Sequence, residues 1–335
     1  MISAMVPLRS KRCLFIMIVC LAAGQAPAAS EFAYKTEAGP HEVVVQSLEL
    51  PFPELDKDLP LRVAFPAAAG PYPVIVFSHG NGSSKDHYSA YTDHWASHGY
   101  VVIQPSHMDS KSLGFSMRPM NYEIMMAISN SRRRDMRYIV DSLAEIERRV
   151  AGLAGKVDPE RIVAAGHSMG GATALRLTGL VFIDPKDGSV TDYRDERFDA
   201  LLLVSDPGNN RLMPDDPWKA IAIPTFIATG TNDYGGMPKR SGKNSAAKPA
   251  LSKGSTMPDT PNHYLYIDAM DHYLGGLICK DDVPGPPDYD ALEIIDGVST
   301  AFLDAYMKGD DNAMAFLQTG PVAELTGDRA TLELR

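Results

Sequence analysis

The sequence predicts an α/β fold with a mostly parallel central sheet and helices on both faces of that sheet. Two observations support this class. Short apolar runs alternate with helical patterns along most of the chain, and the run "YPVIVFSHG" at residues 72–80 is apolar at nearly every position. Such a run is typical of a strand that is buried on both faces of a parallel sheet. The alternation of strands and helices then implies right-handed βαβ units.

The elements follow from these patterns in chain order. The expected strands are short runs rich in aliphatic and aromatic residues, at residues 41–50, 59–66, 72–80, 100–107, 161–168, 200–206, 223–230 and 263–269. Helices are expected at residues 84–97, 131–150 and 288–308 and directly after residue 168. In the second of these, apolar residues recur every three or four positions from Met136 to Val150, which indicates an amphipathic helix.

Polar segments interrupt this alternation. Residues 184–198 are acidic and are expected to form a solvated loop, because their carboxylates do not have the spacing of an ion-binding loop. Residues 237–261 are basic and rich in Gly, Ser and Pro, which is typical of a surface excursion. The arginines at positions 132, 133, 134 and 137 are expected to form the polar face of their helix.

Composition and charge limit the function classes. The chain has 335 residues, of which 44% are hydrophobic, and a formal net charge of −10. This acidic balance argues against a nucleic-acid partner, since such partners require a basic surface. Neither a zinc-ligand motif nor a phosphate-binding glycine loop is present, so no metal and no nucleotide cofactor is expected.

The segment 1–29 has the pattern of a signal peptide. Positive charges precede the apolar run "CLFIMIVCLAA", and "APA" at residues 26–28 matches a cleavage site. The run is too short to span a bilayer, which disfavours the alternative of a membrane anchor; lipidation at Cys20 is a weaker alternative. We therefore expect a secreted or periplasmic protein without stable membrane insertion, its single domain covering residues 30–335. Cys279 is then the one cysteine left after cleavage, so no internal disulfide is expected.

Ser168 lies in the motif "GHSMG" between an expected strand and an expected helix. This context makes G-x-S-x-G a candidate nucleophile turn. The turn is sharp, and Gly166 and Gly170 would remove collisions with neighbouring backbone. A serine hydroxyl attacks poorly at neutral pH unless a base lies within hydrogen-bond reach, so the remaining question is which residues would assist Ser168.

The motifs "FSHGNG", "GHSMGG", "GTND" and "DH" occur in the order found in the α/β-hydrolase superfamily, and the chain resembles that superfamily over residues 43–308. It is similar to secreted dienelactone-hydrolase-related esterases, to platelet-activating-factor-acetylhydrolase-like esterases and to cutinase-like polyester hydrolases. The dienelactone hydrolases proper use a cysteine nucleophile. Lactone specificity is therefore not carried over to a chain with a serine at this position.

The resemblance implies a base and an acid that follow the nucleophile in the chain. His272 is the expected base, because His263 begins its strand at the opposite end of the sheet. Two aspartates fit the acid. Asp206 ends the strand at residues 200–206, as in platelet-activating-factor-type relatives, whereas Asp233 follows Gly230 in "GTND", as in most of the superfamily. We place the acid at Asp233 and keep Asp206 as the alternative.

An oxyanion hole needs two backbone N–H groups that point at the developing negative charge. One is expected at Met169, directly after the nucleophile, and the resemblance places the second at Asn81. The predicted function is a secreted serine hydrolase that cleaves small-molecule or polymeric carboxylic esters through an acyl-enzyme. The alternatives are an amidase or peptidase with the same triad, and a catalytically silent binding protein of the same fold. The acyl-chain length and oligomeric state do not follow from the sequence.

Overall fold

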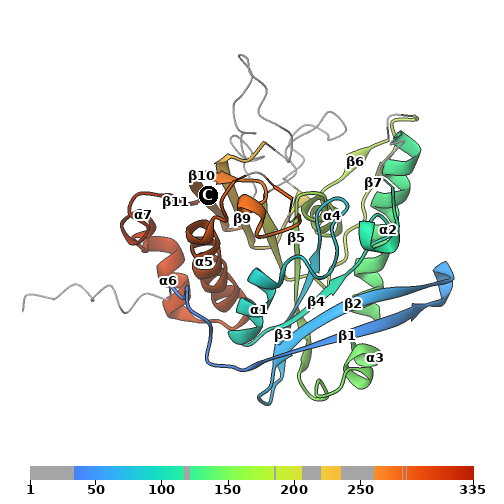
Figure 1. Ribbon diagram of the computed structural model, residues 1–335, viewed down its shortest axis with the longest axis horizontal. Helices are drawn as coiled ribbons and strands as arrows, with labels where there is room; N and C mark the ends of the chain where they lie inside the picture. Colours follow the sequence, from blue (N-terminus) through green and yellow to red (C-terminus); the bar gives the residue numbers. More distant parts are fainter. Residues whose placement is uncertain are drawn as a thin grey trace, which may run out of the picture. The chain divides into compact units, whose positions relative to one another are not determined.

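A mixed sheet lies at the centre of the molecule (Figure 1). The computed structural model describes residues 34–116, 121–184, 186–205, 220–234, 260–280, 282–283 and 285–335, all within one compact unit, Phe32–Arg335. Its strands are β1 (Val43–Phe52), β2 (Lys57–Pro66), β3 (Tyr72–Ser78), β4 (Val101–Pro105), β5 (Val157–His167), β6 (Phe182–Ile183), β7 (Val190–Thr191), β8 (Ala200–Val204), β9 (Thr225–Asn232), β10 (Asn262–Asp271) and β11 (Ala330–Leu334). Its α-helices are α1 (Ser89–Ser97), α2 (Tyr122–Asp141), α3 (Leu143–Arg149), α4 (Met169–Leu177), α5 (Tyr289–Met307), α6 (Asp311–Thr319) and α7 (Val322–Leu325).

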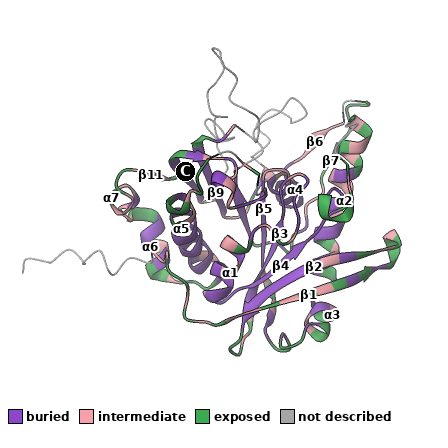
Figure 2. Cartoon of the chain, in the orientation of Figure 1, coloured by how far each residue is buried: buried purple, intermediate pink, exposed green. Residues whose placement is uncertain are grey.

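The strand order within the described residues is β1-β2-β4-β3-β5-β8-β9-β10-β11. In this nine-stranded sheet of described residues the strands from β4 to β10 pair in parallel, and the antiparallel pairs lie at the two edges, where β1, β2 and β4 meet and where β11 pairs with β10; β6 and β7 form a separate antiparallel pair. The predicted α/β-hydrolase fold with a mostly parallel sheet is therefore confirmed. Figure 2 shows the central strands buried along their length.

Each face of the sheet has its own hydrophobic core, and the alternation of side chains along a strand explains why. In β8, Leu202 and Val204 belong to one cluster, whereas Leu201 and Leu203 belong to the other. Successive side chains of a strand point to opposite faces, so a strand that is covered on both sides must be apolar at every position. This accounts for the continuous apolar runs of the sequence.

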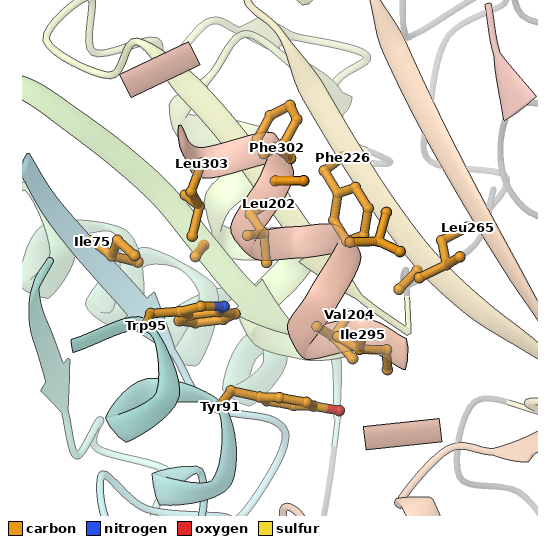
Figure 3. Close-up of a cluster of buried hydrophobic side chains, with 14 of the residues drawn as sticks. Ile75, Tyr91, Trp95, Leu202, Val204, Phe226, Leu265, Ile295, Phe302 and Leu303 are labelled. Carbon is orange, nitrogen blue, oxygen red and sulfur yellow. The ribbon is translucent and has the colours of Figure 1, made fainter. Parts of the chain in front are cut away.

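Helices α1 and α5 cover one face, and helices α2, α3 and α4 cover the other. On the first face Trp95 and Phe302 pack over strand residues such as Leu202 and Phe226 (Figure 3). The indole Nε1–H of Trp95 donates to Ser299 Oγ at 2.9 Å, which joins α1 to α5. Both side chains are buried, so this bond satisfies two polar groups that would otherwise be costly inside the core.

Several expected boundaries were wrong. The single helix expected at residues 131–150 is two helices, α2 and α3, because the chain departs from helical geometry at Ser142, with φ −107° and ψ 11°. Helix α2 also begins earlier than expected, at Tyr122, where the Asn121 side chain caps it by accepting from the Ile124 N–H. Helices α6 and α7 and the edge strand β11 follow α5 and were not expected from the sequence.

Some sequence-based predictions concern residues that the structure does not describe. The proposed signal peptide, residues 1–29, lies outside the described residues, as does most of the basic segment 237–261. Among the residues that are described, no helix has both the length and the apolar character needed to cross a bilayer.

Candidate active site

Ser168 occupies the turn between β5 and α4. Its backbone has φ 54° and ψ −115°, a conformation that L-residues rarely adopt and that costs about 1–3 kcal/mol. The flanking glycines make this turn possible. A Cβ on Gly166 would lie 2.4 Å from the Gly170 carbonyl carbon, and one on Gly170 would lie 1.9 Å from the Ser78 carbonyl oxygen. The strained turn therefore needs glycine at both positions.

His272 and Asp233 lie beside this serine. The Nε2 atom of His272 is 2.9 Å from Ser168 Oγ, and its Nδ1 atom is 2.7 Å from Asp233 Oδ1. Asp233 directly follows β9 and His272 directly follows β10, and these two strands are parallel neighbours. Parallel strands end at one edge of the sheet, so residues 39 positions apart in the chain become hydrogen-bonded partners there.

The structure thus brings together three of the residues expected from the sequence. Asp233 and His272 are buried, while Ser168 is partly exposed. The alternative acid, Asp206, lies outside the described residues. His263, the histidine that was not expected to act as the base, is fully buried and its Nε2 atom is 2.8 Å from the Tyr306 hydroxyl.

The two expected oxyanion donors lie in the loop after β3 and at the first residue of α4. Within the described part of the chain, neither the Asn81 N–H nor the Met169 N–H donates to a protein acceptor. For Met169 this follows from helix geometry, because the first N–H groups of a helix have no intrahelical partner. Both groups are therefore available to an oxygen atom bound beside Ser168.

A buried ion pair holds the Asn81 loop in place. Arg132, fully buried, donates through Nε and Nη2 to the two carboxylate oxygens of Asp109, at 2.8 and 2.7 Å. Its Nη1 and Nη2 atoms also donate to the carbonyl oxygens of His79 and Gly80, at 2.5 and 3.1 Å. Asp109 in turn accepts from the Gly82 N–H at 3.3 Å. Asn81 is therefore braced on both sides.

Electrostatics keep this pair ionised. Burial by itself would raise the pKa of the Asp109 carboxyl, but the adjacent Arg132 guanidinium outweighs this and holds it well below its usual range. The expectation that all the arginines of this helix form a solvated face was therefore wrong for Arg132. Helical spacing could not separate it from Arg133 and Arg134, because the side that α2 turns to the sheet also receives the loop after β3.

A second buried chain of hydrogen bonds joins the Asn81 loop to the His272 loop. The Gly80 N–H donates to the Tyr88 hydroxyl at 2.8 Å, and this hydroxyl lies 3.0 Å from His167 Nδ1. His167 Nε2 lies 2.9 Å from the carbonyl oxygen of His272. No motif in the sequence indicates this role of Tyr88.

Another serine, histidine and aspartate share the connectivity of the Ser168 group. Ser78 Oγ lies 2.9 Å from His107 Nε2, and His107 Nδ1 lies 2.9 Å from Asp135 Oδ2. All three are fully buried. No substrate can reach them, so connectivity alone does not define an active site; exposure and a strained turn distinguish Ser168.

A cavity of about 510 Å³ opens beside Met169. Its walls come from the first half of α2, one side of α4, and the β6–β7 hairpin, which lies beside α2 in Figure 1. The hairpin belongs to the acidic segment 184–198 and its flank, which was expected to be only a solvated loop. Ser189 and Thr191 are exposed to solvent as expected, but together with Asp184 and Tyr193 they also line the cavity, a role that was not expected. The high content of charged residues in this segment concealed its role.

The strand order, the strained serine turn and the neighbouring histidine and aspartate define the class of fold: the chain has the α/β-hydrolase fold. It is homologous to chlorophyllases and to platelet-activating factor acetylhydrolases. The chlorophyllase family profile matches residues 33–196. The resemblance to acetylhydrolase-type α/β-hydrolases is thereby confirmed, and the chlorophyllases are additional relatives that were not expected from the sequence motifs.

Three relatives illustrate this homology. Chlorophyllase type 0 from Chenopodium album is 30% identical over 148 residues, which cover 40% of this chain and 40% of that protein. Platelet-activating factor acetylhydrolase from Cavia porcellus is 24% identical over 283 residues, or 72% of this chain and 59% of that protein. Chlorophyllase-2 from Arabidopsis thaliana is 23% identical over 296 residues, or 78% and 81%. The matched regions thus span less than two thirds of the length of the first two relatives.

Proposed function

We propose that this protein hydrolyses carboxylic esters through an acyl-enzyme formed on Ser168. The observation that carries the proposal is the continuous hydrogen-bonded line from Ser168 Oγ through His272 to Asp233, with distances of 2.9 and 2.7 Å. Homology to proteins named acetylhydrolases supports ester cleavage as the reaction. The chemistry of the side chains supports the order of the steps.

In the first half-reaction Ser168 Oγ attacks the ester carbonyl carbon while His272 Nε2 takes the hydroxyl proton. Asp233 holds the imidazole in the tautomer that leaves Nε2 free to accept, and it stabilises the imidazolium that forms. The carbonyl oxygen becomes an oxyanion and is bound by the N–H groups of Met169 and Asn81. The alcohol leaves with the proton from His272, and the acyl group remains on Ser168.

In the second half-reaction a water molecule gives a proton to His272 Nε2 and attacks the acyl carbon. The same N–H groups stabilise the second oxyanion. Ser168 then leaves as the alcohol, taking its proton back from His272, and the carboxylic acid is released. Each step uses only groups of this chain and water.

Labelling with a fluorophosphonate probe tests for the activated serine. The wild-type protein should be labelled, and Ser168→Ala should not be. Turnover of p-nitrophenyl esters against p-nitroanilides then separates ester from amide cleavage. A folded protein that neither reacts with the probe nor turns over esters would instead be the binding protein considered above.

We also propose that the mature protein begins after Ala28 or Ala29 and is exported. The charged, apolar and small-residue regions of the segment 1–29 support this. N-terminal sequencing of the protein recovered from an expressing bacterial culture, with the culture medium, periplasm and cytoplasm separated, tests it. An intact Met1 in the cytoplasmic fraction alone would contradict the proposal.

A further inference from the structure

One side of α4 forms a continuous wall from the proposed nucleophile to a buried cation. Met169, Ala172, Thr173 and Arg176 all line the cavity described above. Their spacing of three, one and three residues places them in one stripe along the helix. Met169 and Arg176 are seven positions apart, so at 1.5 Å per residue the stripe extends about 10 Å along the helix axis.

The opposite walls suit a long, flexible and apolar group. Met125 and Met126 of α2 face the stripe together with Phe182 and Ile183 of β6. Methionine side chains adapt to irregular apolar ligands because they are unbranched and polarisable. A cavity of about 510 Å³ is within the range of small-molecule sites.

Arg176 lies in this cavity without a carboxylate partner. Its exposed fraction is 6%, and no ion pair joins it to an acid among the described residues. Its Nη1 atom donates to Ser129 Oγ, and its guanidinium lies 4.9 Å from the ring centroids of both Phe182 and Tyr193. Its Nε atom is buried and has no acceptor. Burial lowers the pKa of Arg176, as expected for a cation whose lost hydration is incompletely replaced.

Two charged side chains, those of Arg133 and Asp184, lie near the Arg176 guanidinium. The Arg133 guanidinium stacks 3.5 Å from the centroid of the Tyr193 ring, on which Arg176 also stacks, so the local charge is doubly positive. Asp184 is the carboxylate in the cavity wall, but its Oδ1 accepts from the Tyr122 hydroxyl at 3.0 Å and from the Lys186 N–H at 2.8 Å. These bonds orient Asp184 towards Tyr122 and Lys186, and among the described residues it forms no ion pair with Arg176.

We propose that the cavity holds the acyl chain of the ester and that Arg176 binds a carboxylate at the far end of that chain. The inference rests on the proposed ester hydrolysis at Ser168. The acyl chain is the part of the substrate placed here, because the Met169 N–H binds the carbonyl oxygen and Met169 also opens the cavity. An extended chain of about eight carbon atoms covers the distance of about 10 Å. The substrates of this class are monoesters of medium-chain dicarboxylic acids.

The test compares two esters that differ only at the chain end: p-nitrophenyl octanoate and the mono-p-nitrophenyl ester of octanedioic acid. The wild-type protein should prefer the charged ester in kcat/KM. Arg176→Met should lower kcat/KM for the charged ester by about 10- to 100-fold, the range of hydrogen bonds to charged groups, and should lower the value for the octanoate much less, so that the preference for the charged ester is lost. Arg148→Met, which removes an exposed arginine of α3, is the matched control and should change neither value.

A product-inhibition measurement keeps the inference testable if Arg176→Met does not fold. Octanedioate should inhibit the wild-type protein competitively and more strongly than octanoate, and shorter or longer dicarboxylates should inhibit less. Equal inhibition by the two acids, or an equal loss of both ester activities in Arg176→Met, would overturn the inference while leaving ester hydrolysis intact. Absence of turnover of both esters in the folded wild-type protein would instead overturn the proposed function and this inference with it.

Discussion

His167 donates a hydrogen bond from its Nε2–H to the carbonyl oxygen of His272, at 2.9 Å. The direction of this bond is determined. Burial lowers the pKa of His167 to about 3, so the ring is neutral and carries one proton. A carbonyl oxygen only accepts, so this proton is on Nε2, and Nδ1 must accept from the Tyr88 hydroxyl. The residue that precedes the nucleophile in the chain thus holds the backbone of the histidine that activates it.

We predict that His167→Phe lowers kcat for ester hydrolysis by about 10- to 100-fold with a smaller change in KM. Loss of the bond lets the His272 loop shift, and a displacement of about 1 Å in an active site costs about this much. His167→Gln keeps a donor and should recover part of the rate. Steady-state kinetics with p-nitrophenyl esters measure both variants. The control is His263→Gln, at the opposite end of β10, which should keep the wild-type kcat; an equal loss in it would assign the effect to general destabilisation.

The acid can be identified by comparing two aspartates. Asp233→Asn should reduce ester hydrolysis by up to about 10⁴-fold, because an amide in this position favours the wrong histidine tautomer. Asp206→Asn should cost far less. Circular dichroism would first establish that both variants are folded, after which their turnover is compared. The opposite ranking would move the acid to Asp206.

The buried ion pair of the Asn81 loop should dominate local stability. Arg132→Met leaves Asp109 buried and unpaired, and we expect a loss of about 3–5 kcal/mol in the free energy of unfolding. Arg134→Met on the same helix removes an exposed contact with Glu54, whose nearest atoms are 3.6 Å apart, and should cost less than about 1 kcal/mol. Urea unfolding of the two variants measures the difference in the free energy of unfolding. Similar midpoints would show that the buried Arg132 contributes no more to stability than the exposed Arg134.

Acid should destabilise the protein below about pH 6.5. Burial lowers the pKa of His167 to about 3 and those of His94 and His263 to about 4, and it also lowers those of His79 and His107. The unfolded chain therefore binds more protons than the folded chain as the pH falls from about 6.5 towards 4, so the free energy of unfolding decreases there. Each such histidine contributes up to about 1.4 kcal/mol per pH unit.

Acids whose pKa is raised by burial oppose this trend, and Asp296 is the most deeply buried of them. Burial raises the pKa of Asp296, so the folded chain takes up a proton there at a higher pH than the unfolded chain does, which offsets part of the histidine effect. Thermal melting between pH 8 and pH 4 should show a plateau above neutrality and a steep decline below it. His94→Gln should reduce the number of protons bound on unfolding by about one, so the melting temperature should fall less steeply as the pH decreases. A melting temperature that stays constant from pH 7 to pH 5 would contradict the prediction.

The residues beside the reacting bond could be placed from the sequence because chain order and strand ends constrain them. Ser168 sits in a local motif, and Asp233 and His272 each follow an apolar run whose end lies at one edge of a parallel sheet. The second acid could not be excluded, since Asp206 satisfies the same condition.

The supporting residues could not be placed in this way. The sequence does not distinguish Arg132 from the exposed arginines of the same helix. Its burial depends on the Asp109 carboxylate, which is 23 positions away in the chain. The cavity depends on the β6–β7 hairpin folding against α2, and the charged residues between the two short strands resemble those of a solvated loop. Edge strand β11 pairs with β10 only after α5, α6 and α7 have returned the chain to the sheet, and no local pattern encodes that return.

The backbone conformation of Ser168 has an evolutionary consequence. Glycine adopts its dihedral angles, φ 54° and ψ −115°, without the steric cost that a side chain carries, so Ser168→Gly should be at least as stable as the wild-type protein although it cannot form an acyl-enzyme. Stability and catalysis therefore exert opposite pressures on one position. In a lineage that no longer needed hydrolysis, the hydrogen bond between Ser168 Oγ and His272 Nε2 would be the remaining contribution of the serine side chain, and the backbone strain would favour its replacement by glycine.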